Sequence, residues 1–314
     1  MSGRLPSTAC NHMRSCVRCE QLIGISPMIN MTAMAADALG QLLADDFKRM
    51  FGTGHSEGAE RLSSIARTAL ECIARSDALY HNMEHTLLVT LVGLDVLHGM
   101  SLSRRIEPDD YTHLLIACLL HDIGHVRGVL SGDGDNSFVI DATGACVALC
   151  RGASDAALGP YHVDRSKLFA KERLEDSPAI DADRVVRAIE FTRFPARPER
   201  ENQPEELEPR LVQAADLIGQ LGDPLYLKKA NALFYEFDEN GLNRQFGYEC
   251  PADLVDKYPD FYWRSVSPFL REAMLYLNVT ASGRQWIANL QSHIFCAQHS
   301  FALMGPQRGA ASRH

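Results

Sequence analysis

Apolar residues recur at intervals of three and four along most of the chain, which is the spacing of one face of an α-helix. Alternation at every second residue, the pattern of a half-buried strand, is never sustained. The spacing therefore predicts an all-α protein. Helices are expected at 33–51, 58–76, 80–99, 110–122, 136–151, 163–175, 181–193, 206–221, 224–238, 259–279 and 283–303.

The order of these helices predicts a single domain. The segment 195–210 is rich in proline and charge, but helical spacing resumes directly after it, so we expect an exposed connection within one domain. We expect a loose leader over 1–32, one helical domain over 33–305 and a flexible tail over 306–314.

Composition and charge narrow the classes of partner. The chain has 46% hydrophobic and 23% charged residues, a net charge of -9 and a pI near 5.7. Binding to nucleic acid or to an anionic membrane surface requires clustered Lys and Arg, so neither is expected. No apolar run is long enough to cross a membrane, and the N-terminus does not resemble a secretory signal, which favours a cytoplasmic protein.

The cysteines do not suggest a disulfide framework. Their number, nine, is odd, and most lie in helical patterns where a reduced cysteine behaves as a small apolar residue. Cys10, Cys16 and Cys19, close to His12, lack the second half of a typical zinc motif. Zinc binding and a leader without any ligand both stay open, as does a later start at one of three methionines, Met28, Met31 or Met34.

Two short segments concentrate histidine. "YHNMEH" covers 80–85, and its two histidines, His81 and His85, are four residues apart, which places both on one face of a helix or of its first turn. "HDIGH" covers 121–125, and it ends an almost wholly apolar helix. A carboxylate at the end of a buried helix is costly unless it is paired or binds a metal.

A third segment, after the two histidine-rich ones, places a polar residue in equally apolar surroundings. Asp216 occurs in "LVQAADLIGQL" without a Lys or Arg three or four residues away, so it requires a cation from elsewhere. A metal ion held by His85, His121, Asp122 and Asp216 would satisfy all of these groups. By contrast, isolated histidines on apolar faces are expected to be hydrogen-bonded packing residues; these are His98, His113 and His293.

The ordered set of motifs resembles the HD-domain metal-dependent phosphohydrolase superfamily, whose signature is H…HD…D on a helical core. More narrowly, "YHNMEHTLLVTLVGLDVL" and "HDIGHVRG" resemble the YHNxxH and HDxxHxG motifs of class I cyclic nucleotide phosphodiesterases. The resemblance runs from about Tyr80 to Tyr235 and implies a single multi-helix bundle of the HD-domain, phosphodiesterase-like type.

Roles for individual residues follow from this resemblance. It implies that His85, His121, Asp122 and Asp216 bind a first metal, typically zinc, and that Asp122 bridges to a second one, magnesium or manganese. It makes His81 the general acid and His125 a second catalytic group, which either supports the metal ligands from behind or lies on the substrate side. His162 occupies the place of the histidine-rich segment beside the second metal.

The chain also departs from the family pattern. Leu130 replaces an asparagine of the extended HD motif, and Thr192 and Arg193 stand where the family has an acid. Gln285 is a candidate for the family's purine-binding glutamine, although the aromatic residue follows it at a different offset. Arg127 and Arg193 are candidates for phosphate contacts.

The expected function is hydrolysis of a small phosphate ester, a phosphodiester such as a cyclic nucleotide or a nucleotide, by a metal-activated water with His81 as general acid. Two alternatives stay open: an HD-fold di-iron oxygenase, which uses additional histidines between the HD pair and the final aspartate, and a non-catalytic nucleotide-binding module. The sequence leaves the physiological substrate, the second metal and the oligomeric state undetermined.

Overall fold

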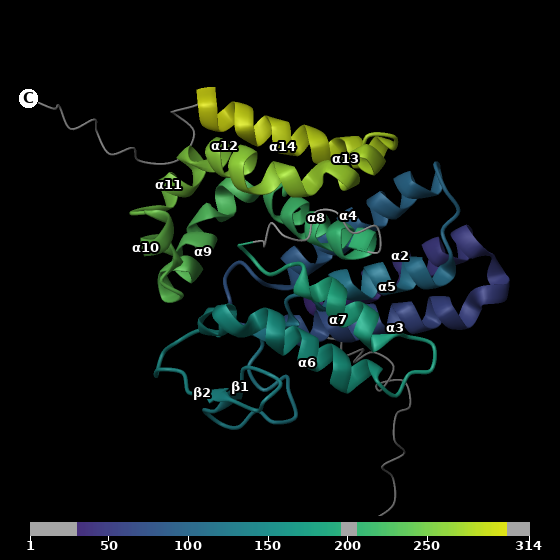
Figure 1. Cartoon of the computed structure of the whole chain (residues 1–314), viewed down its shortest axis with the longest axis horizontal. Helices are drawn as coiled ribbons and strands as arrows, with labels where there is room; N and C mark the ends of the chain where they lie inside the picture. The colour runs from purple at the N-terminus through teal and green to yellow at the C-terminus, as the bar shows by residue number, and fades with distance from the viewer. Residues whose placement is uncertain (1–29, 196–205, 300–314) are drawn as a thin grey trace, which may run out of the picture. The chain divides into compact units, whose positions relative to one another are not determined.

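A computed structural model describes residues 30–195 and 206–299. Its contacts divide the chain into Met1–Met31 and Thr32–His314. The structure is 72% helical with only two short strands among the described residues, which confirms the all-α prediction (Figure 1). The cysteine cluster of the leader, most of the predicted connection over 195–210 and the predicted tail lie outside the described residues.

Most predicted helices appear close to their expected positions. They are α2 (Met31–Phe51), α3 (Ser56–Ile73), α4 (Met83–Ser101), α5 (Pro108–Leu120), α6 (His162–Leu174), α7 (Ala182–Glu190), α8 (Leu207–Leu221), α9 (Tyr226–Glu239) and α14 (Ala281–His299). The last four residues of the predicted 283–303 helix lie outside the described residues.

The core is built around α4, α5 and α8. Every residue of α5 from Tyr111 to Leu120 is buried, as the continuous apolar run requires. Pro108 at its first turn and the acidic residues Asp109 and Asp110 favour the start of this helix. The contact between α4 and α8 is the most extensive between any two described helices, so the residues along it are held closely in register.

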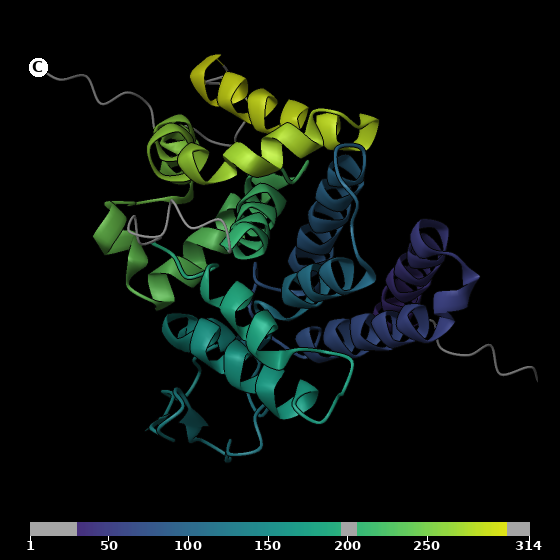
Figure 2. The same ribbon diagram turned by 45° about the vertical axis from the view of Figure 1, so that its right-hand side comes forward.

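Further helices cover this core on two sides. In both views α6 and α7 lie on one side of α4 and α8, and α13 (Arg271–Leu277) and α14 lie on the other (Figures 1 and 2). α9 is followed by two short helices that the sequence did not predict, α10 (Leu242–Phe246) and α11 (Pro251–Asp256). None of the helices in the described ranges is sufficiently long and apolar to cross a membrane.

The prediction of a helix over 136–151 is wrong. This segment forms a small antiparallel pair, β1 (Phe138–Val139) with β2 (Cys146–Val147), joined by a turn. The Asp141 carboxylate accepts hydrogen bonds from the backbone and hydroxyl of Thr143, which closes the turn locally. Such side-chain bonds to neighbouring backbone compete with helix formation, and they outweigh the apolar spacing here.

The prediction of a single helix over 259–279 is also wrong. The segment is α12 (Tyr258–Phe261), a π-helical turn, a 3₁₀ turn at Ser267–Leu270 and then α13. Pro268 has no backbone N–H, and its ring clashes with the preceding turn of a helix. An uninterrupted α-helix is therefore excluded at this point.

The three histidines expected to be packing residues do form structural hydrogen bonds. His98 Nε2 lies 2.9 Å from Asp46 Oδ2, and His293 Nδ1 donates to the Leu221 carbonyl. His113 Nδ1 donates to the Asp109 carbonyl, and its Nε2 accepts from the backbone N–H of Asp181. The bonds of His98 and His293 and the bond from Asp181 to His113 each join two elements, whereas the bond from His113 to Asp109 lies within α5.

Candidate metal centre

The first two histidines of the centre are positioned by the start of α4. The Asn82 side chain accepts hydrogen bonds from the backbone N–H groups of Glu84 and His85, and so caps this helix. His81 therefore lies just before the helix and His85 in its first turn, with ring centroids 5.6 Å apart. The asparagine of the "YHN" segment thus has a structural task.

The end of α5 supplies the next pair. His121 Nδ1 donates to the Cys118 carbonyl at 2.8 Å, which leaves Nε2 as the ring nitrogen that faces the centre. Asp122 follows with only 3% of its surface exposed. Burial opposes the charge on both groups, but their mutual attraction raises the pKa of His121 and lowers the pKa of Asp122.

Four side chains from three helical regions converge at one point. His85 Nε2 lies 3.3 Å from both Asp122 Oδ2 and Asp216 Oδ1, and His121 Nε2 lies 3.1 and 3.5 Å from the same two oxygens. The two imidazole Nε2 atoms are 3.4 Å apart. The sequence predicted this convergence of His85, His121, Asp122 and Asp216.

This donor set suits a cation. Ligand atoms of His85, His121 and Asp216 all lie within 4.8 Å of one another, so this group could hold a metal ion. Among the described side chains, Asp122 Oδ2 is buried without a hydrogen-bond partner. A buried carboxylate oxygen beside two imidazole nitrogens is a costly arrangement that a divalent cation relieves.

A second group of ligands lies directly beside the first. His81, Asp122 and His125 also have donor atoms within 4.8 Å of one another. His125 stacks between His81 and His162, with ring centroids 4.8 and 4.6 Å away. Burial, together with the neighbouring imidazoles of His162 and His81, lowers the pKa of His125 well below its usual value, which favours a neutral ring that can bind a metal.

The orientation of His125 has a structural cause in α6. The Arg165 guanidinium donates to the carbonyls of Gly124 and Val126, on either side of His125, and pairs with Asp133. A Cβ atom on Gly124 would lie 2.0 Å from the His162 carbonyl oxygen, so only glycine permits this approach of α6. His125 and His162 are thereby brought together.

Glu236 on α9 was not predicted from the sequence. Its Oε2 lies 2.5 Å from His81 Nδ1, and its Oε1 accepts from the backbone N–H groups of Tyr80 and His81. Burial opposes the imidazolium form of His81, but this carboxylate outweighs it and raises the pKa of His81 to about 9. An acid on an apolar helix face, the signal that identified Asp216, also marks Glu236 between Leu233 and Phe237.

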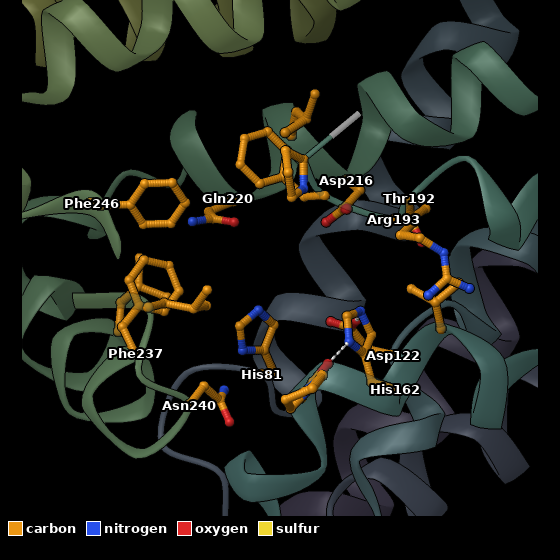
Figure 3. A pocket seen from close by; sticks show the side chains of 18 of the residues that line it. His81, Asp122, His162, Thr192, Arg193, Asp216, Gln220, Phe237, Asn240 and Phe246 are labelled. Carbon is orange, nitrogen blue, oxygen red and sulfur yellow. Dashed lines mark hydrogen bonds and ion pairs between the residues drawn. The ribbon is translucent and has the colours of Figure 1, made fainter. Parts of the chain in front are cut away.

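A cavity of about 420 Å³ opens over these groups. Figure 3 shows Asp122, His162 and Asp216 on one side of His81 and Phe237 and Phe246 on the other. Its volume is sufficient for a small organic ligand. Gln220, four residues after Asp216, also lines the cavity, and the sequence pattern did not predict it.

The structure does not bring every candidate to the cavity. Arg127 forms hydrogen bonds with Asp77 and Asp155 and does not line it. Gln285 lies on α14, where its amide donates to Asn289, and it is also outside the cavity. Arg193 does line the cavity. The nearby aromatic residues of α9 and α10 were not predicted.

The fold and the centre define an all-α protein with a buried cluster of histidines and aspartates that could hold metal. Residues 29–300 match the Npun_R2479-like family, and the chain therefore belongs to that family. No curated protein and no solved structure matches the chain.

Proposed function

We propose that the protein is a metal-dependent phosphohydrolase that cleaves a small phosphate ester. The observation that carries this proposal is the convergence of two imidazoles and two carboxylates, those of His85, His121, Asp122 and Asp216, beside the pair of His81 and Glu236. Asp122, Asp216 and His81 line one cavity. The resemblance to the HD-domain phosphohydrolases supports the same reaction class. The free cysteines of the described residues fit the reducing cytoplasm, where we place the protein.

The residues suit two divalent cations. His85, His121, Asp122 and Asp216 would hold the first, for which zinc suits the nitrogen and oxygen donors. Asp122 and His125 would hold the second, magnesium or manganese, with His162 beside them. When bound, such cations lower the pKa of water and neutralise charge on a phosphoryl group.

His81 is suited to deliver a proton. Glu236 engages Nδ1, so Nε2 is left to face the substrate, and the raised pKa keeps the ring protonated at neutral pH. In the reaction a water molecule releases one proton to solvent, its oxygen bonds to phosphorus, and the bond from phosphorus to the leaving oxygen breaks. His81 Nε2 gives its proton to that oxygen and later regains one from solvent.

The test combines metal analysis with kinetics. We expect hydrolysis within a panel of phosphate mono- and diesters assayed with zinc, manganese and magnesium. Asp216→Ala should lose bound metal, whereas His81→Ala should keep it and lose rate by about 10² to 10⁴. His55→Ala, at an exposed histidine outside the cavity, is the matched control. Activity that survives both substitutions would disprove the assignment.

A di-iron oxygenase is the second candidate, because His125 and His162 stack beside Asp122 and add imidazoles to the centre. Iron bound in mixed valence, together with oxygen consumption, would favour it over hydrolysis. Tight nucleotide binding by the metal-loaded protein without any product would instead indicate a non-catalytic module.

A further inference from the structure

The ionisable groups of the cavity are confined to one end. His81, Asp122, His125, His162 and Asp216 all belong to the metal centre or adjoin it. Among the described lining residues, Arg193 is the one Lys or Arg side chain, and acidic partners already engage it. Its guanidinium donates to Glu190 at 2.9 Å and to Asp164 at 2.8 Å.

The other end of the cavity is walled by aromatic and aliphatic side chains. Phe246 of α10 lies between Phe237 of α9 and Tyr248, with ring centroids 6.3 and 5.9 Å away. Leu233, Leu242 and Leu254 complete this wall. We call these six residues the apolar compartment.

His81 stands between the metal centre and the apolar compartment (Figure 3). A general acid at this position gives its proton to the leaving oxygen, so the organic group on that oxygen extends away from the centre. The compartment is the part of the cavity that lies in this direction. Its occupant is therefore the leaving group and not the phosphoryl group.

The polar side chains among the described lining residues on this side are few. Apart from tyrosine hydroxyls, they are the side-chain amides of Gln220 and Asn240, which flank His81 (Figure 3). A nucleoside buried here would bring more hydroxyl, amine and ring-nitrogen groups than two side-chain amides and the tyrosine hydroxyls can pair, and each unpaired group carries a desolvation cost. An apolar group carries no such cost.

We propose that the apolar compartment binds the leaving group of the ester, and that this group is an uncharged apolar alcohol or phenol. The inference rests on the proposed phosphohydrolase function, and it narrows the substrate to an ester with one phosphate and a hydrophobic organic group. A second phosphate or a carboxylate on the leaving group would meet aromatic rings without a free cation among the described lining residues.

Affinity for small phosphate esters tests this. We would titrate the full chain, loaded with zinc and magnesium, with phenyl phosphate, ribose 5-phosphate and adenosine 5′-monophosphate in a calorimeter, and would take the affinity for any ester that is hydrolysed from its KM instead. Phenyl phosphate should bind about tenfold more tightly than ribose 5-phosphate, because its ring is buried in the compartment. Equal affinities, or tighter binding of the nucleotide, would overturn the proposal.

Variants locate the effect. Phe246→Ala and Phe237→Ala should each remove most of the advantage of phenyl phosphate and leave ribose 5-phosphate unchanged. Phe295→Ala is the control, since Phe295 is exposed on α14 and outside the cavity. The three ligands are also compared on the unsubstituted protein, so the test remains valid even if one of the variants fails to fold.

Failure of this inference can be told apart from failure of the proposed function. Hydrolysis of esters without any preference for a phenyl leaving group would overturn the compartment and leave the reaction standing. Selective binding of phenyl phosphate without hydrolysis of any ester would overturn the proposed reaction and leave the compartment standing. If none of the three ligands binds, both proposals are overturned.

Discussion

The Glu236 carboxylate contacts the backbone of Tyr80 and His81 and the imidazole of His81 at the same time. One carboxylate oxygen accepts the N–H groups of Tyr80 and His81, and the other faces His81 Nδ1. Because only 2% of Glu236 is exposed, the charge depends on these partners. Fixing Nδ1 also fixes which nitrogen of His81 faces the cavity.

Glu236→Gln keeps the size of the side chain and removes its charge. We expect kcat to fall by about 10- to 100-fold with little change in KM, since the group acts through His81. The carboxylate raises the pKa of His81 to about 9, so its loss lowers that pKa. His81 then loses its proton at lower pH, and the alkaline limb of the pH–rate profile should move to lower pH.

The matched control is Glu239→Gln on the same helix, where the carboxylate is exposed and contacts Ser154. It should leave kcat and the pH profile unchanged. An unaltered pH profile in Glu236→Gln would show that the carboxylate does not act through the His81 proton.

At the scale of elements, the distance between two metal ligands depends on how closely two helices approach. His85 and Val89 are one turn apart on α4, as Asp216 and Gly219 are on α8. A Cβ atom on Gly219 would lie 2.7 Å from Val89 Cγ2 and 3.0 Å from its backbone N. The absence of a side chain at 219 therefore permits the close approach of His85 and Asp216.

Gly219→Ala should separate the two helices. We expect a loss of stability of about 1–3 kcal/mol from overpacking, together with weaker binding of the first metal, measured by competition with a chromogenic chelator. Gly54→Ala, where an added Cβ meets nothing within 4 Å, should change neither quantity. Metal affinity equal to that of the unsubstituted chain would contradict this explanation of the geometry.

Sequence patterns predicted the helices that bury a continuous apolar face, such as α4, α5 and α8, because burial sets both the pattern and the element. They failed at 136–151, where Asp141 and Thr143 close a turn through local hydrogen bonds. The ligands could be predicted because a buried acid such as Asp216 needs a cation. Phe246 could not be, since an aromatic residue at helical spacing predicts a core position equally well as a cavity wall.

At the scale of the whole molecule, the candidate centre joins segments that are distant in sequence. Its ligands come from the start of α4, the end of α5 and the middle of α8, and these helices form the core. A cation bound there by the folded state alone would link all three helices, because the unfolded chain does not hold the ligands together. Metal binding should therefore contribute directly to the stability of the fold.

Removal of metal tests this linkage. With free metal at 100 times its Kd, binding adds about 2.7 kcal/mol of stability, so chelation should lower Tm by about 5–10 °C. In Asp216→Ala the same chelator should have little effect, because the first cation is already lost. A chelator-induced shift of equal size in both proteins would place the stabilising metal elsewhere.

The buried ion pair of Arg165 and Asp133 determines which part of the β1–β2 segment the centre depends on. Arg165 donates hydrogen bonds to the backbone on both sides of His125, and Asp133 neutralises the charge of Arg165. The segment that contains β1 and β2 follows Asp133 and leads back to α6. We expect that the segment 140–153 could be lengthened or replaced without disturbing the centre, provided that Asp133 and Arg165 are kept. We accordingly expect this segment, which does not line the cavity, to accept an inserted reporter peptide without loss of metal binding.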